Sequence, residues 1–308
     1  MKQITLLLSA LLLFSACSES EKEKVIDTLQ GIKVRDGENV LSITDLNDTL
    51  SETSGLAYVD GTLWAHNDSG GEAKLYAISE NNGSILKTVT ISNATNVDWE
   101  DLAFDETHLF IGDFGNNRGI RKNLSIYKVK LADLKTETTV EAEKIAFSYA
   151  TQTDFTANSS TNYDCEAFIA YENNLYLFSK NYGNAQTDMY KLGMSSVEVA
   201  EKVSTFDTGA LVTGASIDVS NKSLALIGYG ASSTSEGNPK TWIFSEFTDT
   251  DFFKGKQEKI SWGTPNIAQI EGVTHKEKGE LYIGSEKLNY DNGLLSVTIK
   301  QKLYKLNY

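Results

Sequence analysis

Short runs of β-branched, aromatic and other apolar residues recur along the chain, and clusters of Gly, Asn and Asp separate them. Long stretches with the 3.6-residue period of an amphipathic helix are hard to find. Apolar runs of this length, bounded by turn-forming residues, are typical of β-strands in all-β proteins. The pattern therefore predicts an all-β body.

One arrangement of strands occurs five times. In each copy a pair of small or acidic residues precedes a large apolar residue, which we call the first anchor. A second apolar anchor follows about seven residues later and begins another strand. The first anchors lie at positions 56, 102, 168, 217 and 273, which suits four-stranded propeller blades with loop insertions. The copies are Ser54-Gly55-Leu56 with Leu63-Trp64, Glu100-Asp101-Leu102 with Leu109-Phe110, Glu166-Ala167-Phe168 with Leu175-Tyr176, Ala215-Ser216-Ile217 with Leu224-Ala225, and Glu271-Gly272-Val273 with Leu281-Tyr282.

A third strand follows in every copy, but a fourth follows in only the first four, near 84–92, 144–150, 202–208 and 258–262. The run Val40–Thr44 stands alone before the first copy and can supply the missing strand. Closing the ring in this way removes exposed sheet edges. We therefore expect one domain, residues 38–308, that forms a five-bladed β-propeller with residues 38–46 completing the last blade. A β-sandwich and a six-bladed ring with a degenerate blade are the alternatives.

The first residues have the form of a secretory signal. Lys2 is followed by an apolar run over residues 4–14, then by Ser15, Ala16 and Cys17. The segment 14–17 resembles the bacterial lipobox, which implies cleavage after residue 16 and acylation of Cys17; an uncleaved anchor or a non-lipidated signal is the alternative. Residues 17–37 are expected to form a polar tether, and the acidic residues after Cys17 resemble the surface-export signal of Bacteroidota lipoproteins. We thus expect lipid anchoring in the cell envelope, at the periplasmic or surface face of the outer membrane.

Several blade motifs, taken in order, resemble those of the SdiA-regulated (YjiK-like) propeller family over roughly residues 40–308. The resemblance implies a propeller fold and an envelope location, and it implies no activity, because that family has no settled one. Two stretches, 66–71 and 112–118, depart from the family's pattern, so no residue role is carried over. The motifs are Ser54-Gly55-Leu56-Ala57-Tyr58, Glu166-Ala167-Phe168-Ile169-Ala170, Val212-Thr213-Gly214-Ala215, Ile270-Glu271-Gly272-Val273 and Leu281-Tyr282-Ile283-Gly284-Ser285-Glu286.

The charge balance narrows the range of partners. The chain has 28 Lys and Arg against 42 Asp and Glu, a formal net charge of −14. Phosphate neutralisation needs a basic surface, so nucleic acid is not an expected partner. Cations or basic ligands fit better. With two Cys, 17 and 165, there is no disulfide framework.

The repeat places Glu100, Glu166 and Glu271 at one equivalent position, where the chain enters the innermost strand, with Ser54 and Ala215 at that position in the other copies. Carboxylates that converge on one axis repel each other unless a cation neutralises them. Ca²⁺ and other hard divalent cations prefer such oxygen ligands. The sequence therefore predicts a Ca²⁺ or other divalent cation site and no organic cofactor.

Further polar residues lie at the ends of the second strands. They would gather at the same end of the central channel as the three glutamates, which we call the mouth. They are Asn67, Asp68, Asp113, Lys180 and Glu286. We assign Asp68 and Asp113 to the metal site, and Asn67, Lys180 and Glu286 to ligand binding. Structural capping of backbone amides, pairing of Lys180 with a carboxylate, and a catalytic carboxylate are the alternatives.

The loop 112–119 is the most polar segment near an expected inner strand. Asn116, Asn117 and Arg118 are candidate ligand-binding residues, because amide oxygens can ligate a cation and a guanidinium can grip an anion. A Gly/Asn turn with surface charge is the alternative. Motifs of zinc hydrolases, serine hydrolases and P-loops are absent from the sequence, and Cys165 is expected to be a small buried residue.

Three functions remain open. The first is a lipid-anchored module that binds a small ligand or an envelope protein, with a divalent cation in its acidic channel. The second is a metal-dependent hydrolase of phosphate esters or lactones that uses the same channel. The third is a purely structural role in the envelope. The sequence leaves open whether the protein is an enzyme.

Overall fold

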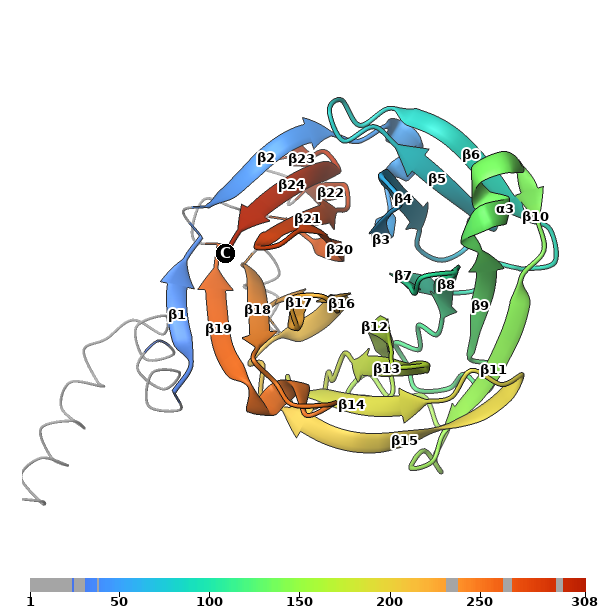
Figure 1. The fold of residues 1–308 in the computed structure, drawn as a ribbon. Coiled ribbons are helices and arrows are strands. Elements are labelled where there is room, and N and C mark those ends of the chain that lie inside the picture. The colour runs from blue at the N-terminus through green and yellow to red at the C-terminus, as the bar shows by residue number, and fades with distance from the viewer. Residues whose placement is uncertain (1–23, 25–30, 38, 231–237, 263–267, 292–295) are drawn as a thin grey trace, which may run out of the picture.

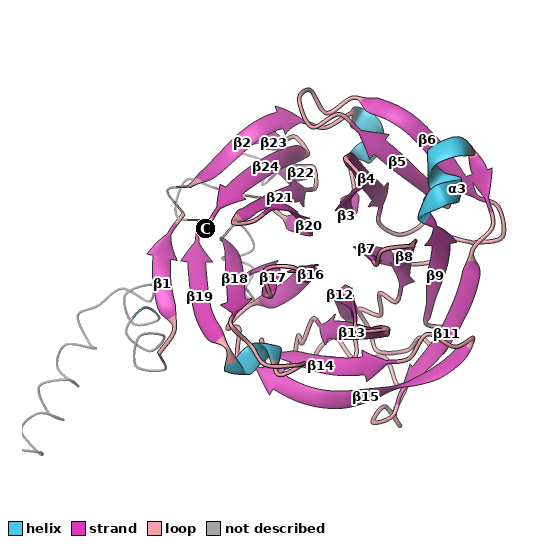
Figure 2. Cartoon of the chain, viewed as in Figure 1, coloured by secondary structure: helices cyan, strands magenta, loops and turns pink. Residues whose placement is uncertain are grey.

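The computed structural model describes residues 24, 31–37, 39–230, 238–262, 268–291 and 296–308. The expected signal peptide 1–16 and Cys17 lie outside the described residues. The described strands surround a common centre, as Figure 1 shows, and the cartoon in Figure 2 shows how little helix accompanies them. The prediction of an all-β propeller is confirmed.

The five innermost strands lie around the axis, and each one contacts the next, so that they form a closed ring in the order of the chain. They are β3 (Thr53–Val59), β7 (Trp99–Phe104), β12 (Cys165–Tyr171), β16 (Leu211–Asp218) and β20 (Ile270–Glu277).

Each inner strand begins a radial group of antiparallel strands. The second strands are β4 (Thr62–Asn67), β8 (His108–Asp113), β13 (Asn174–Ser179), β17 (Ser223–Tyr229) and β21 (Glu280–Ser285). The third strands are β5 (Lys74–Ile78), β9 (Ser125–Lys130), β14 (Thr187–Leu192), β18 (Pro239–Ser245) and β24 (Lys302–Asn307). The outer strands are β6 (Ile85–Ile91), β11 (Glu143–Tyr149), β15 (Val197–Phe206), β19 (Lys256–Ser261) and β2 (Val40–Asp45).

The N-terminal strand closes the ring as the repeat predicted. Strand β2 pairs antiparallel with β24, from Val40 opposite Leu306 to Asp45 opposite Lys302. In Figure 1 the blue β2 therefore lies beside the red β24. Between β11 and β12, residues 150–164 form turns and irregular structure, in agreement with the loop expected there.

Extra strands pair in parallel at the rim. Strand β1 (Lys33–Asp36) joins β19, and β10 (Thr139–Val140) joins β6. Residues 33–36 of the expected tether 17–37 therefore form a strand. The backbone of β1 pairs with the outer edge of β19, and such pairing does not require an apolar sequence. Parallel pairing of β11 with β15 merges two groups into one eight-stranded sheet.

A few short elements complete the described part of the chain. They are the hairpin β22 (Leu288–Asp291) and β23 (Ser296–Ile299), helix α3 (Leu131–Thr136), and the 3₁₀ turns η1 (Asp48–Leu50) and η2 (Phe252–Lys254). None of the helices in the described residues is both long and apolar enough to cross a membrane.

Every inner strand carries a register shift near its start, where the inner strand has one residue more than the second strand. Such bulges change the direction in which the extra side chain points. The shifts fall between Thr53 and Leu56, Trp99 and Asp101, Cys165 and Ala167, Val212 and Gly214, and Ile270 and Gly272.

The expected alignment of the fourth copy is wrong by two residues. It treated Ile217 as the counterpart of Leu102 and thus placed Ala215 opposite Glu100 in the repeat. Strand pairing instead puts Ala215 at the position of Leu102 and makes Thr213 the counterpart of Glu100. Both hairpins have four residues in the turn, but between bulge and turn each strand of the fourth copy is one residue longer than in the second copy. The start of the second strand therefore lies two residues further from the bulge residue, and a shift of two along a strand keeps the same face buried.

Inner strands approach one another closely because glycine occurs where their backbones meet. A Cβ on Gly272 would overlap the carbonyl oxygen of Ser54, and a Cβ on Gly214 would lie 2.8 Å from the carbonyl oxygen of Glu271. At Gly55 a Cβ would lie 2.6 Å from the backbone nitrogen of Leu102. The axis is thus packed by backbone as well as by side chains.

Asp101 connects three of these strands. Its fully buried carboxylate accepts the N–H of Leu102 at 2.8 Å, of Phe168 in β12 at 3.1 Å and of Ala215 in β16 at 3.2 Å. Burial raises the pKa of Asp101, and the three N–H donors oppose that rise. One carboxylate thus supplies acceptors for amides of three successive blades.

We predict that Asp101→Asn lowers the free energy of unfolding by roughly 2 to 4 kcal/mol. The carboxylate accepts backbone N–H groups through both oxygens, whereas the amide NH₂ of asparagine is a donor. It would leave a buried backbone N–H without an acceptor. Urea denaturation measures this change. The control, Asp207→Asn at an exposed position, should stay within about 0.5 kcal/mol of the parent protein. Equal stability of the two variants would contradict the role of Asp101.

Candidate metal centre

The bulges bring the three repeat glutamates to one end of the axis. Glu100, Glu166 and Glu271 are the extra residues of β7, β12 and β20, and each is buried. Glu166 is close enough to raise the pKa of both Glu100 and Glu271 through charge repulsion. The expected convergence of these side chains therefore occurs.

Within this set, a tighter cluster forms on one side. Carboxylate oxygens of Asp68, Asp98 and Glu100 all lie within 4.8 Å of one another. A Cβ on Gly115 would overlap Glu100 Oε1 and lie 2.5 Å from Asp98 Oδ2. Glycine at 115 therefore leaves the space in which these two carboxylates approach.

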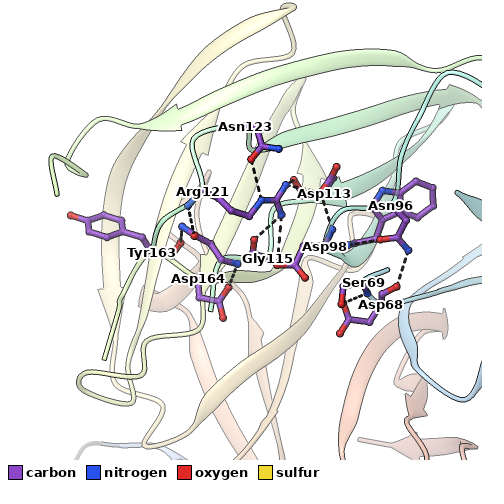
Figure 3. A network of polar contacts seen from close by, with 12 residues as sticks. Asp68, Ser69, Asn96, Asp98, Asp113, Gly115, Arg121, Asn123, Tyr163 and Asp164 are labelled. Atoms are coloured by element: carbon purple, nitrogen blue, oxygen red, sulfur yellow. Dashed lines mark hydrogen bonds and ion pairs between the residues drawn. The ribbon is translucent and has the colours of Figure 1, made fainter. Parts of the chain in front are cut away.

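The backbone around the cluster is held by Asn96. Its Nδ2 donates to the carbonyl oxygens of Asn67 at 3.1 Å and Asp68 at 2.8 Å, and its Oδ1 accepts the N–H of Trp99 at 3.2 Å. Figure 3 shows Asn96 between the segments that carry Asp68 and Asp98. The N–H of Ser69 donates to the Asp68 carboxylate, which orients that side chain.

Arg121 pairs with Asp113 beside the cluster (Figure 3). Its Nη2 lies 2.8 Å from Asp113 Oδ1, its Nη1 donates to the carbonyl oxygen of Gly115 at 2.7 Å, and Nη1 lies 3.7 Å from Asp98 Oδ2. Asp113 also accepts the N–H of Asp98 at 3.2 Å. Asp113 therefore supports the loop and Asp98 and lies outside the cluster, although the sequence assigned it to the metal site.

Lys180 neutralises the other side of the mouth. Its ammonium lies 2.8 Å from Glu166 Oε2, with both side chains almost fully buried, and it lies 5.3 Å from the ring centre of Tyr229. Burial alone would lower the pKa of Lys180, but Glu166, Tyr229 and Glu271 together raise it well above its usual value. Pairing of Lys180 with a carboxylate was one of the alternatives from the sequence, and Glu166 is that carboxylate.

Glu271 and Glu286 share an amide donor. Gln269 Nε2 donates to Glu271 Oε1 at 3.0 Å and to Glu286 Oε2 at 2.7 Å, and the Tyr229 hydroxyl lies 3.3 Å from Glu271 Oε1. Among the described residues, Glu271 Oε2 and Asp164 Oδ2 are buried without a hydrogen-bond partner. Buried acceptors without donors indicate groups that a proton or a bound cation would satisfy.

The pKa values show how crowded this mouth is. Burial, followed by repulsion from neighbouring carboxylates, raises the pKa of Asp68 to about 7, and the pKa of Glu286 to about 9. Burial also raises the pKa of Asp98 to about 6, although Arg121 opposes that rise. Burial raises the pKa of Glu271 to about 8, although Lys180 opposes that rise. The pKa of Glu100 is raised well above its usual value for the same two reasons as that of Asp68.

The remaining predicted ligand-binding residues lie apart from the cluster. Asn67 Nδ2 donates to the carbonyl oxygen of Thr49. Asn116 is buried and caps its own loop, where its Oδ1 accepts the N–H of Arg121. Asn117 and Arg118 are exposed on that loop.

Sequence reasoning missed Asp98, Asp164, Gln269, Tyr229 and Arg121. A signal was present for three of them, since Asp98, Asp164 and Gln269 each stand two residues before a repeat glutamate. Each of the three directly precedes its inner strand, so the repeated spacing was readable from the sequence. Arg121 carries no such periodic signal, because a loop determines its position.

Known structures were compared with the whole fold. A glucose dehydrogenase crystal structure aligns with a TM-score of 0.50 and 7% identity, over 87% of this chain and 99% of that chain. A second glucose dehydrogenase structure aligns with a TM-score of 0.48 and 10% identity, over the same shares. A putative gluconolactonase aligns with a TM-score of 0.44 and 10% identity, over 91% of this chain and 94% of that chain. No protein-family model and no curated protein matches the sequence. At 7% identity, the first similarity shows the propeller fold alone.

The raised carboxylate pKa values predict an unusual pH dependence of stability. Unfolded carboxyl groups ionise near pH 4. In the folded protein the pKa values of these groups are about 6 to 9. Between about pH 4 and those values, the native carboxyl groups therefore keep protons that the unfolded chain has lost. Without divalent cations the native state should lose stability as pH rises from 5 to 8.

Thermal melts in EDTA at several pH values measure this loss as a falling midpoint. The double variant Asp68→Asn and Asp98→Asn removes two of the titrating groups and should flatten the slope. A midpoint that is constant or rises over this range in the parent protein would be incompatible with the crowded mouth.

Proposed function

We propose that this protein is a lipid-anchored binding protein of the cell envelope that holds a divalent cation, Ca²⁺ first among them, at Asp68, Asp98 and Glu100. One observation supports the proposal above all, namely that the oxygens of these three carboxylates lie within 4.8 Å of one another. At that distance like charges repel strongly in a partly buried site. A divalent cation converts this repulsion into attraction.

The chemistry of the donors favours a hard cation. All three side chains offer oxygen, which Ca²⁺ and Mg²⁺ prefer over nitrogen and sulfur. Asp98 and Glu100 lie on the segment that enters β7, and Asp68 directly follows β4, so the ligands come from two blades. Cation binding would therefore tie these two blades together and order this mouth for a small ligand or an envelope protein.

Hydrolysis of a phosphate ester or lactone is the second candidate. The observation that favours it is the Lys180 ammonium, whose charge reaches both Asp68 and Asp98. An ammonium beside a metal ion can stabilise the negative charge that develops on a substrate oxygen. A phosphate-ester and lactone screen of the Ca²⁺-loaded protein separates this candidate from binding alone.

The envelope location rests on the N-terminal sequence and on the resemblance to the SdiA-regulated family. The lipobox-like segment 14–17 predicts that Cys17 carries the lipid. We expect the full-length parent protein to take up a labelled fatty acid and to fractionate with membranes. Cys17→Ser should remove the label and release the protein, whereas Ser18→Ala, next to it, should change neither. A membrane-bound, unlabelled parent protein would indicate an uncleaved anchor instead.

For the cation site, we expect Ca²⁺ to raise the melting midpoint of residues 25–308, by about 2.7 kcal/mol of stabilisation at a hundredfold excess over Kd. Asp98→Asn and Glu100→Gln should each weaken binding by about tenfold or more, as measured by calorimetry. Glu141→Gln and Glu201→Gln, at exposed positions, serve as matched controls and should leave Kd unchanged.

Glu271→Gln distinguishes the two ways of building the site. It should have a small effect if Asp68, Asp98 and Glu100 are the ligands, and it should abolish binding if the three repeat glutamates are. Unchanged Ca²⁺ binding in Asp98→Asn and Glu100→Gln would refute the assignment.

A further inference from the structure

A cavity of about 890 Å³ lies at the end of the axis opposite the metal centre. Hairpin turns between the first and second strands of all five groups line it, and they are residues 59–60, 105–107, 172–173, 218–221 and 277–278. The volume is that of an ordinary small-molecule or peptide pocket. Every blade contributes to one concave surface.

The cavity is separate from the metal centre. Between the two ends, the axis is filled by apolar side chains that include Leu56, Leu102 and Phe168, each almost fully buried. The space that remains among them is only about 10 Å³, about the least that a single water molecule requires. A ligand in the cavity therefore touches none of the carboxylates of the metal centre.

The walls combine apolar surface with aromatic rings. Tyr58, Phe104 and Tyr171 come from three different blades, and Ile217 and Met194 add aliphatic surface. The Lys276 ammonium lies 3.8 Å from the ring centre of Tyr58, so this wall already accepts a cation over an aromatic face.

Negative charge dominates the rim. Its carboxylates are those of Asp60, Asp105, Glu106, Glu172, Asp218 and Glu277, against Lys276 and Lys278. Lys276 is already paired with Glu80 at 2.7 Å, and Asp60 is paired with Lys135 at 2.9 Å. Among the described residues, Glu106, Glu172 and Glu277 have no cationic side chain within ion-pair distance, and all three are exposed.

We propose that this cavity binds a basic peptide, with lysine or arginine side chains reaching the unpaired rim carboxylates and an apolar residue seated against the aromatic wall. A free metal ion is a poor fit, because its ligands must lie within direct coordination distance, whereas the cavity has room for several residues. A peptide also fits the combination of opposite charge at the rim and apolar surface inside, as is usual for peptide-binding surfaces. The proposal is independent of the proposed function, since it uses none of its residues.

Two capped tripeptides, Lys-Leu-Lys and Glu-Leu-Glu, test the proposal by calorimetric titration of the chain from residue 25. The basic peptide should bind and the acidic one should not, and affinity should fall as salt rises from 50 to 500 mM. The triple variant Glu106→Gln, Glu172→Gln and Glu277→Gln should weaken binding by about tenfold.

A matched triple variant, Glu137→Gln, Glu141→Gln and Glu201→Gln, removes equal charge from exposed positions away from the cavity and should leave the affinity within about twofold. Val219→Trp keeps the charge but fills the cavity mouth from an exposed position, and it should abolish binding. Equal weakening by both triple variants, or binding that survives Val219→Trp, would overturn the proposal, as would no binding of the basic peptide. The Ca²⁺-dependent melting shift should persist in all these variants, so failure here is distinguishable from failure of the metal centre.

Discussion

The carboxylate of Asp101 is the interaction on which the centre of this molecule depends. A ring of inner strands brings backbone amides together at an axis that apolar side chains fill. Asp101 accepts the N–H groups of Leu102, Phe168 and Ala215, which belong to three successive blades. These bonds fix how close the strands lie, and glycines at their contacts permit that distance.

The same spacing creates the electrostatic problem at the metal centre. Strands that close at the axis force the side chains of their bulge residues together, and in three blades that residue is glutamate. One side of the mouth is neutralised internally, since Lys180 pairs with Glu166. The other side gathers Asp68, Asp98 and Glu100, and its cationic neighbour Arg121 lies 3.7 Å from Asp98 and is shared with Asp113. Protons or, as we propose, a divalent cation balance the remaining negative charge.

Opposite ends of the same strand pairs carry different chemistry. Strand starts and bulges, which are fixed by the sheet, build the metal centre, whereas hairpin turns build the cavity at the other end. Turns vary in length without disturbing the ring: two residues lie between the last paired residues of β3 and β4, and four lie between those of β7 and β8. The apolar filling around Leu56 and Phe168 insulates the two ends. A single propeller can thus hold two independent binding surfaces, since loops carry specificity on a rigid scaffold.

The sequence by itself determined the all-β body, the repeat, the N-terminal strand that closes the ring and the glutamates that converge, because strand periodicity and turn residues are local. It misassigned the fourth copy, since a shift of two residues preserves the alternation of a strand. Asp98 belongs to the carboxylate cluster, and Asp113 instead pairs with Arg121, because the loop that carries Arg121 folds back beside them. Such choices depend on distances between segments far apart in the chain. Only the tertiary structure decides them, because electrostatic pairing depends on distance in space and leaves no periodic pattern in the sequence.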